Sequence, residues 1–378
     1  MSESISATPA QFWSQRVRDR EWPKWESTGR SLTMVDLFCG CGGLSMGGAF
    51  AAQELKRKLT IKLAIDNWQP AMDVYKKNFG NISRSIVLGD VRNVIPTSVS
   101  NVDIVVAGPP CQGHSDLNNS TRRVDDRNEL YVAAVEFAIA CKSRVVLVEN
   151  VPAVVHSSQQ VVTRSVTALN ESGYATEEIV LDVSNLGIPQ RRKRHLLIAS
   201  RIHSKSKLAE MVNGIKALQA RPKLIDFIGD LKDAPPGVSK LSQITRMSQE
   251  NIGRIKYLFD NNLYDLPNVL RPPCHRDKVH SYSSMYGRLR PDRPAQTITS
   301  GFGSMGQGRF VHPIRARTIT PHEAARIQGF PDFFDFGAAE TLTDLRDMIA
   351  NAVPPALAAA VLVQLFQPEK VSKGIRDR

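Results

Sequence analysis

The fold of this chain is set by a stretch near its start, which reads Ser31-Leu32-Thr33-Met34-Val35-Asp36-Leu37-Phe38-Cys39-Gly40-Cys41-Gly42-Gly43-Leu44. Its first eight residues are mainly apolar, as in a buried strand, and a glycine-rich turn follows directly. Helical spacing of apolar residues then covers 44–56, and a second strand is predicted over 59–66. Strand, helix and strand in this order form a βαβ unit with parallel strands.

The same alternation continues to about residue 201. Further strands are predicted over 85–88, 102–107, 144–149, 177–182 and 194–199, and helices over 69–78, 130–141 and 159–172. This order predicts an α/β fold, in which a mostly parallel sheet has helices on both faces. A threonine cap, a first-turn proline and a stop glycine (Thr320, Pro321, Gly329) mark a later helix, and the last helix is predicted over 355–366.

Composition sets limits on the class of protein. The 378 residues, 42% hydrophobic and 23% charged, suit one large globular domain with one smaller one. There is no run of 18 apolar residues and no secretory signal pattern in the first ten residues, so we expect a cytoplasmic protein without a membrane span. The five cysteines are odd in number and lack zinc-ligand spacing, which predicts reduced thiols and no metal.

Residues 201–292 form a basic segment. They hold 16 Lys or Arg against 9 Asp or Glu, which is +7 of the chain's net charge of +12. Strand periodicity is weak there and proline-rich loop signals are frequent. The segment is therefore predicted to be a separate, loop-rich domain that faces a polyanion, with a merely solvated surface as the alternative.

A possible nucleophile stands at Cys111. It follows Gly108-Pro109-Pro110, directly after the buried strand 102–107, so its thiol is presented at the carboxyl end of that strand on a restricted backbone. Glu149 ends the strand 144–149, so one sheet edge can carry both a nucleophile and an acid. A thiolate adding to carbon 6 of cytosine, with nitrogen 3 protonated by a carboxylic acid, makes carbon 5 nucleophilic. Taken singly, each residue also fits a purely structural role. Cys111 can be a small buried apolar residue, and Glu149 can cap the segment that follows its strand.

The glycine-rich turn is a candidate nucleoside site. Glycines allow close approach at a strand end, where open α/β sheets bind ligands. Gly40 and Gly42 lack the third glycine of the dinucleotide fingerprint, which argues against a nicotinamide cofactor. Asp66 can accept from ribose hydroxyls and Asp90 from an adenine amino group. A purely structural tight turn is the alternative.

Six short motifs in a fixed order resemble the DNA (cytosine-5)-methyltransferase family. They are Asp-x-Phe-x-Gly-x-Gly-Gly (36–43), Pro-Pro-Cys-Gln (109–112), Glu-Asn-Val (149–151), Gln-Arg-Arg-Lys-Arg (190–194), Arg-Pro-Ala-Gln-Thr-Ile-Thr (293–299) and Asn-Ala-Val (351–353). The resemblance implies a bacterial-type, S-adenosylmethionine-dependent enzyme with a Rossmann-like, doubly wound catalytic domain (31–200 and 293–378). It also implies an inserted target recognition domain (201–292). Residues 1–30, with Trp13 and Trp22, lie outside the resemblance and are predicted to be a helical extension packed on the core.

The resemblance also implies roles for single residues. Cys111 is the nucleophile, Glu149 the acid at nitrogen 3, Arg194 the residue that holds the base oxygen and the glutamate, and Arg192 a nearby structural or phosphate contact. The cofactor pocket is predicted to comprise Asp36, Phe38, Gly40, Gly42, Gly43, Leu44, Asp66, Asn67, Asp90, Pro109 and Asn351.

A base inside a duplex cannot present carbon 6 to a thiolate, so the target must be flipped out of the stack. Residues 114–128 are polar and charged, and are predicted to be a loop that closes over DNA, with an ordinary surface loop as the alternative. The predicted DNA contacts are Gln112, Ser115, Arg271, Arg276, Lys278 and Arg288. The partners expected are duplex DNA, bound by a monomer, and a cognate restriction endonuclease.

Two other classes of protein share this pattern. A tRNA cytosine-5 methyltransferase keeps the catalytic motifs, but that branch carries a Cys-Phe-Thr element that is absent here. A non-catalytic DNA-binding homologue is the second alternative, and the presence of Cys111, Glu149 and Arg194 speaks against it.

Overall fold

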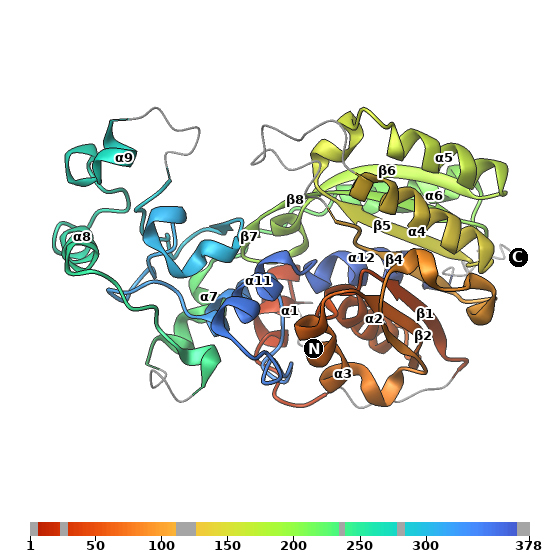
Figure 1. The fold of residues 1–378 in the computed structure, drawn as a ribbon, viewed down its shortest axis with the longest axis horizontal. Coiled ribbons are helices and arrows are strands. Elements are labelled where there is room, and N and C mark those ends of the chain that lie inside the picture. The colour runs from red at the N-terminus through yellow and green to blue at the C-terminus, as the bar shows by residue number, and fades with distance from the viewer. Residues whose placement is uncertain (1–6, 23–28, 111–125, 234–238, 278–283, 369–378) are drawn as a thin grey trace, which may run out of the picture.

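The computed structural model describes residues 7–22, 29–110, 126–233, 239–277 and 284–368 (Figure 1). Its centre is a seven-stranded sheet in the order β3-β2-β1-β4-β5-β8-β6. The strands are β1 (Leu32–Leu37), β2 (Leu59–Asp66), β3 (Ile86–Leu88), β4 (Ile104–Ala107), β5 (Val145–Asn150), β6 (Ala175–Asp182) and β8 (Lys193–Ser200). β3, β2, β1, β4 and β5 pair in parallel, and β8 runs antiparallel between β5 and β6. The predicted mostly parallel α/β fold is confirmed.

Helices cover both faces of this sheet (Figure 1). One face carries α2 (Gly43–Glu54), α3 (Gln69–Phe79), α6 (Lys205–Lys216) and α12 (Pro355–Phe366), and the other carries α4 (Glu129–Ala140) and α5 (Val161–Glu171). Side chains alternate between the faces along a strand, so Met34 packs with the first group and Val35 with the second. The central strands β4 and β5 are buried on both faces, which explains their nearly continuous apolar sequence.

The last helix packs against the first helix of the sheet. A Cβ built on Gly47 of α2 would lie 2.3 Å from the carbonyl oxygen of Pro355 and 2.7 Å from the Cβ of Ala358. Only glycine permits this approach. The end of the chain is thereby brought against the glycine-rich turn that precedes α2.

Further helices and two short strands complete the large domain. α10 (Pro321–Gln328) begins with a capping box between Thr320 and Glu323 and ends at Gly329, whose φ is +91°, as its cap signals predict. α11 (Leu342–Asn351) leads into α12. The short strands β7 (Gln190–Arg191) and β9 (Ala295–Gln296) pair in parallel. At the N-terminus, α1 (Pro9–Arg16) buries Trp13 against the large domain, as the sequence predicts for this extension.

The inserted segment carries α7 (Ile225–Ile228), α8 (Gln249–Asp260) and α9 (Pro273–Arg276). It has a small core of its own, with Ile255, Leu258 and Leu266 packed on Tyr286, Met305 and Val311. The amide of Ile225 donates to the carbonyl of Pro291 at 3.0 Å, so the entry and exit of the insertion are joined. α6 and α7, in contrast, pack in the core of the large domain, α7 through Phe227 and Ile228, and the borders 201 and 292 stay a prediction.

Among the described residues, one stretch is long and apolar enough to cross a membrane, Leu342–Phe366. It consists of α11 and α12, separated by the Pro354-Pro355 step, and 61% of its most apolar window is buried in the protein. Its apolar character is accounted for by packing on α2 and α10.

Candidate active site

The carboxyl ends of five neighbouring strands meet at one edge of the sheet, and among the described residues Asp66, Pro109 and Glu149 lie there. Backbone hydrogen bonds extend past the strand ends. Gly108 donates to Leu37 at 3.2 Å and Cys39 to Ile65 at 3.1 Å, which holds the glycine-rich turn beside the ends of β2 and β4. Glu149 is the next-to-last residue of β5, which pairs with β4. The fold therefore places the glycine-rich turn and Glu149 at one edge.

The glycine-rich turn has a backbone conformation that favours glycine. φ is positive at Phe38 (+56°), Gly40 (+52°) and Gly42 (+103°), so the backbone curls before α2 begins. The amide of Gly40 donates to Asp66 Oδ2 at 2.8 Å, and the amide of Trp68 donates to Asp66 Oδ1 at 2.9 Å. The pKa of Asp66 is raised overall, because the effect of burial is larger than the opposite effect of these hydrogen bonds. Asp66 thus fixes the turn and keeps lone pairs for a ligand.

Asp36 lies deeper than a ligand-lining residue would. Its side chain is fully buried, and Ser45 Oγ donates to Asp36 Oδ2 at 2.6 Å while lying 2.7 Å from the Tyr75 hydroxyl. Burial is the main reason why the pKa of Asp36 rises to about 7. Its packing assigns Asp36 to the support of the turn, between β1, α2 and α3.

The last motif closes the site from the other side. A Cβ on Gly43 would lie 2.1 Å from the carbonyl oxygen of Val353, and one on Gly108 would lie 3.5 Å from Val353 Cγ2. Asn351 is exposed at the end of α11. Arg192 is buried and donates to the carbonyls of Ala350 at 2.8 Å and Ala352 at 3.3 Å. Arg192 therefore holds the backbone on both sides of Asn351, which favours its predicted structural role over a phosphate contact.

The predicted acid and its arginine form a buried ion pair. Arg194 Nε lies 2.7 Å from Glu149 Oε1, and the two side chains are only 13% and 8% exposed. They come from the antiparallel neighbours β8 and β5, where Glu149 pairs with Leu196, so Arg194 lies diagonally opposite. A Cβ on Gly108 would lie 3.8 Å from Glu149 Oε2. The glutamate therefore lies close to Gly108, which is three residues before Cys111 in the sequence.

The proline pair is anchored by Asn150, whose Nδ2 donates to the carbonyl of Pro109 at 3.2 Å. Cys111, with Gln112 and Ser115, lies outside the described residues, as does Lys278. Among the other predicted pocket residues, Asn67 is exposed and Leu44 and Pro109 are buried. The Asp90 carboxylate is engaged by Arg92, with Nε 3.0 Å from Oδ1.

Arg288 differs from its predicted role as a DNA contact. Its side chain is 8% exposed, its Nε donates to the carbonyl of Pro313 at 2.8 Å, and its guanidinium lies 4.0 Å from the Phe259 ring centre and 5.1 Å from that of Tyr264. These contacts make it part of the small domain's core. Arg276 is exposed beside Asp277, and Arg271 is half-buried.

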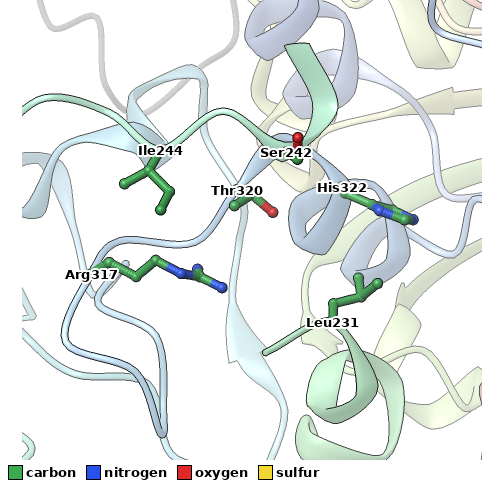
Figure 2. Close-up of a pocket in the computed structure, with 6 residues that line it drawn as sticks. All are labelled: Leu231, Ser242, Ile244, Arg317, Thr320 and His322. Atoms are coloured by element: carbon green, nitrogen blue, oxygen red, sulfur yellow. The ribbon is translucent and has the colours of Figure 1, made fainter. Parts of the chain in front are cut away.

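Two hollows lie at the root of the insertion, and none of the predicted site residues lines them. The smaller has room for about one water molecule and is lined by Leu231, Ser242, Ile244, Arg317, Thr320 and His322 (Figure 2). The larger, about 560 Å³, lies among Arg20, Lys240 and the phenylalanines at 333, 334 and 336. Within the described part of the chain, no three His, Cys, Asp or Glu side chains gather as metal ligands.

Sequence reasoning missed three supports of the site. Ser45 holds Asp36 and is itself bonded to Tyr75, Asn150 holds the proline pair, and Arg192 holds the carbonyls around Asn351. A signal existed only for Asn150, which follows the predicted acid directly. The other contacts join residues far apart in the sequence.

Comparison with known proteins bears on the whole chain. A model of the C-5 cytosine-specific DNA methylase family matches residues 32–367. The chain is 41% identical over 363 residues to the type II methyltransferase M1.BsuMI of Bacillus subtilis, covering 90% of this chain and 82% of that protein. It is 27% identical over 357 residues to the type II methylase M.HgiDII of Herpetosiphon aurantiacus, covering 91% and 97%.

Solved structures share the fold. The Entamoeba histolytica methyltransferase EhMeth superposes with a TM-score of 0.61 at 18% identity, covering 89% of this chain and 98% of that one. The S. pombe Dnmt2 methyltransferase does so at 0.57 and 16%, covering 88% and 97%. The chain belongs to the C-5 cytosine-specific DNA methylase family. It is a DNA (cytosine-5)-methyltransferase, which confirms the resemblance that its motifs carry.

Proposed function

We propose that this methyltransferase uses S-adenosylmethionine to methylate carbon 5 of a flipped-out cytosine in a specific duplex sequence, through a covalent adduct of Cys111 at carbon 6. The observation that carries the proposal is the buried Glu149–Arg194 pair beside Gly108. It supports a proton donor close to Gly108, which precedes the proposed nucleophile by three residues.

The residues at the strand ends fit the proposed cofactor. The turn from Phe38 to Gly43 leaves close access to backbone, and Asp66 has acceptor oxygens for hydroxyl groups. Asn67 and Asn351 are exposed polar side chains. When bound, S-adenosylmethionine supplies the methyl group that carbon 5 receives.

The protein's own residues then carry the rest of the chemistry. The Cys111 thiolate adds to carbon 6, and Glu149 gives its proton to nitrogen 3, so that the new electron pair reaches carbon 5. Arg194 holds the Glu149 carboxylate and the base oxygen. After carbon 5 is methylated, its hydrogen leaves as a proton, the carbon 6–sulfur bond breaks, and Cys111 and Glu149 return to their starting states.

Duplex DNA is the proposed substrate, bound by a monomer between the catalytic edge and the insertion. We propose Arg271, Arg276 and Lys278 as phosphate or base contacts on the insertion, and Gln112 and Ser115 as contacts beside the nucleophile. The type II names of the relatives support a role in a restriction–modification system, with a cognate endonuclease in the same cytoplasm.

Transfer of a tritiated methyl group to duplex DNA or to tRNA tests the substrate class. The proposal expects incorporation into duplex DNA, little into tRNA, and none into DNA by Cys111→Ser. Bisulfite sequencing of the product then gives the site. Incorporation into tRNA alone would support the tRNA enzyme, and no incorporation into either would support a non-catalytic DNA-binding protein.

A further inference from the structure

Within the N-terminal extension, the described residues 7–22 are anchored on the large domain at Trp13 and at Trp22, although the family model begins only at residue 32. Trp13 packs edge-on against Phe50 of α2, with ring centres 5.4 Å apart. Trp22 packs on Phe79, at 5.6 Å, and on Phe333, at 5.0 Å. The extension therefore lies across the large domain as a fixed segment.

Between these anchors, the extension is bonded to the chain that follows α10. The amide of Asp332 donates to the carbonyl of Val17 at 2.9 Å, and the amide of Phe333 donates to that of Asp19 at 2.9 Å. Val17 is fully buried. These two hydrogen bonds fix the position of residues 17–19 against residues 332 and 333.

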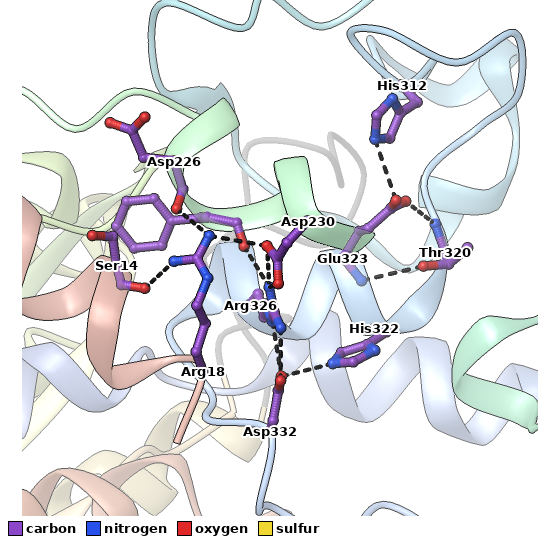
Figure 3. A network of polar contacts seen from close by, with 11 residues as sticks. Ser14, Arg18, Asp226, Asp230, His312, Thr320, His322, Glu323, Arg326 and Asp332 are labelled. Carbon is purple, nitrogen blue, oxygen red and sulfur yellow. Dashed lines mark hydrogen bonds and ion pairs between the residues drawn. The ribbon is translucent and has the colours of Figure 1, made fainter. Parts of the chain in front are cut away.

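Arg18 reaches from the extension to the insertion (Figure 3). Its Nη2 donates to Asp230 Oδ1 at 2.9 Å and to the carbonyl of Asp226 at 2.7 Å, and its Nη1 donates to the carbonyl of Ser14. Asp226 is in α7 and Asp230 in the 3-10 helix that follows it (Gly229–Asp233). The extension thus holds the segment through which the chain enters the insertion.

Asp230 is also held from the large domain. Arg326 of α10, 3% exposed, donates to both oxygens of Asp230 at 2.7 and 2.8 Å, and to Asp332 at 2.8 and 2.6 Å. His322 Nε2 lies 2.7 Å from Asp332 Oδ1. Burial alone would raise the pKa of Asp332, but Arg326 and His322 lower it well below its usual range, so the pair stays charged. Both carboxylates that neutralise Arg326 are therefore tied to the extension, one through Arg18 and one through the Val17 carbonyl.

We propose that residues 8–22 are a brace that fixes the root of the insertion to the catalytic domain, and that Arg18 is a positioning residue for DNA engagement. This inference rests on the proposed function of the insertion in reading DNA. The joint between Ile225 and Pro291 makes the two ends of the insertion one root, so holding α7 holds the whole insertion. A loosened root leaves the insertion aligned for only a fraction of the time, and the apparent DNA affinity falls by that fraction.

The test compares Arg18→Ala with Arg20→Ala, a matched loss of charge two residues along the same segment. Arg18→Ala is expected to raise the KM for DNA about two- to fivefold, the size of a partly exposed charge pair, with kcat and cofactor Kd unchanged. Arg20→Ala is expected to leave the KM for DNA, kcat and the cofactor Kd unchanged. Arg18→Lys is expected to have a KM for DNA close to that of the unchanged protein. In an Asp230→Asn background, Arg18→Ala is expected to add little, because the two residues act through one contact.

A second measurement reports on the joint without DNA. Spin labels on Cys274 of the insertion and on a cysteine at exposed position 136 of α4, in a Cys111→Ser background, give the distribution of distances between the two parts. Arg18→Ala is expected to broaden it and Arg20→Ala is not. An unchanged distribution together with an unchanged KM, even if the melting temperature falls, would overturn the brace. A broadened distribution with unchanged DNA affinity would support the joint but reject DNA reading by the insertion.

Discussion

At the residue scale, the site depends on a few buried polar contacts that set charge and direction. The Glu149–Arg194 pair could be predicted because the motifs that carry the two residues resemble those of the family, and the resemblance implies the pairing. The chain of contacts from Asp36 through Ser45 to Tyr75 could not be, because no local pattern reveals which buried hydroxyls from other elements bond a carboxylate or one another. The reversal for Arg288 has the same cause, since a sequence does not show which arginines stack on rings inside a core.

Glu149→Gln tests the acid. The amide keeps the shape of the side chain but cannot protonate nitrogen 3, so methyl transfer is expected to fall by about 10²- to 10⁴-fold. Binding of duplex DNA is expected to change little. Single-turnover assays with measured DNA affinity check both, and near-normal turnover would mean that another group protonates the base.

Asp36→Asn tests the buried carboxyl under the turn. Burial raises the pKa of Asp36 from about 3.8 to about 7, so the folded state favours the protonated form. The stability due to this group is present below about pH 4 and is lost as the pH rises through about 7. As the pH is raised from 5 to 8, the melting temperature of Asp36→Asn is therefore expected to rise relative to that of the unchanged protein. A difference that does not vary with pH would refute the assignment.

At the scale of elements, the strands and helices of the sheet follow local patterns, and their predicted bounds lie close to the observed ones. α10 was marked by its own cap, proline and glycine, and these are the residues that bound it. Arg192 shows where such patterns end. Its partners are carbonyls about 160 residues away, and only the packing of α11 and α12 on the turn brings them together.

Gly43→Ala tests this packing of the chain's end on the cofactor turn. The new Cβ would lie 2.1 Å from the Val353 carbonyl oxygen, so the backbone must move. We expect a loss of stability of about 1–3 kcal/mol and weaker cofactor binding, measured by thermal unfolding and by calorimetry. Gly253→Ala in α8 is the control, because a Cβ there meets nothing within 4 Å, and it is expected to stabilise by about 0.5–1 kcal/mol. Equal effects of the two substitutions would contradict the packing argument.

At the scale of the whole molecule, the candidate site is built from an early and a late part of the chain, and the insertion extends beside them (Figure 1). Composition could identify the basic segment, but not where its core begins, because α6 carries basic residues and still packs on the sheet. The small core also takes residues from beyond 292. Charge marks the surface that a segment presents, and packing decides the domain to which it belongs.

Alanine at Arg271 and Arg276 together tests whether the insertion binds DNA phosphates. Each lost phosphate contact is expected to weaken binding to all sequences alike and to lower the salt slope by about one. Arg164→Ala is the control, because Arg164 is exposed on α5, where it pairs with Glu129. Titrations at several salt concentrations check this. If the double variant and the control behave alike, these arginines are a solvated surface.

The central claim is that Cys111 attacks carbon 6 while Glu149 activates the base. Incubation with duplex DNA that carries 5-fluorocytosine at the target position, in the presence of S-adenosylmethionine, tests it most directly, because fluorine cannot leave carbon 5 as a proton would. We predict a covalent protein–DNA complex that survives denaturing electrophoresis, and none with Cys111→Ser. A complex that persists in Cys111→Ser, or none with the unchanged protein while it still methylates normal DNA, would contradict the account.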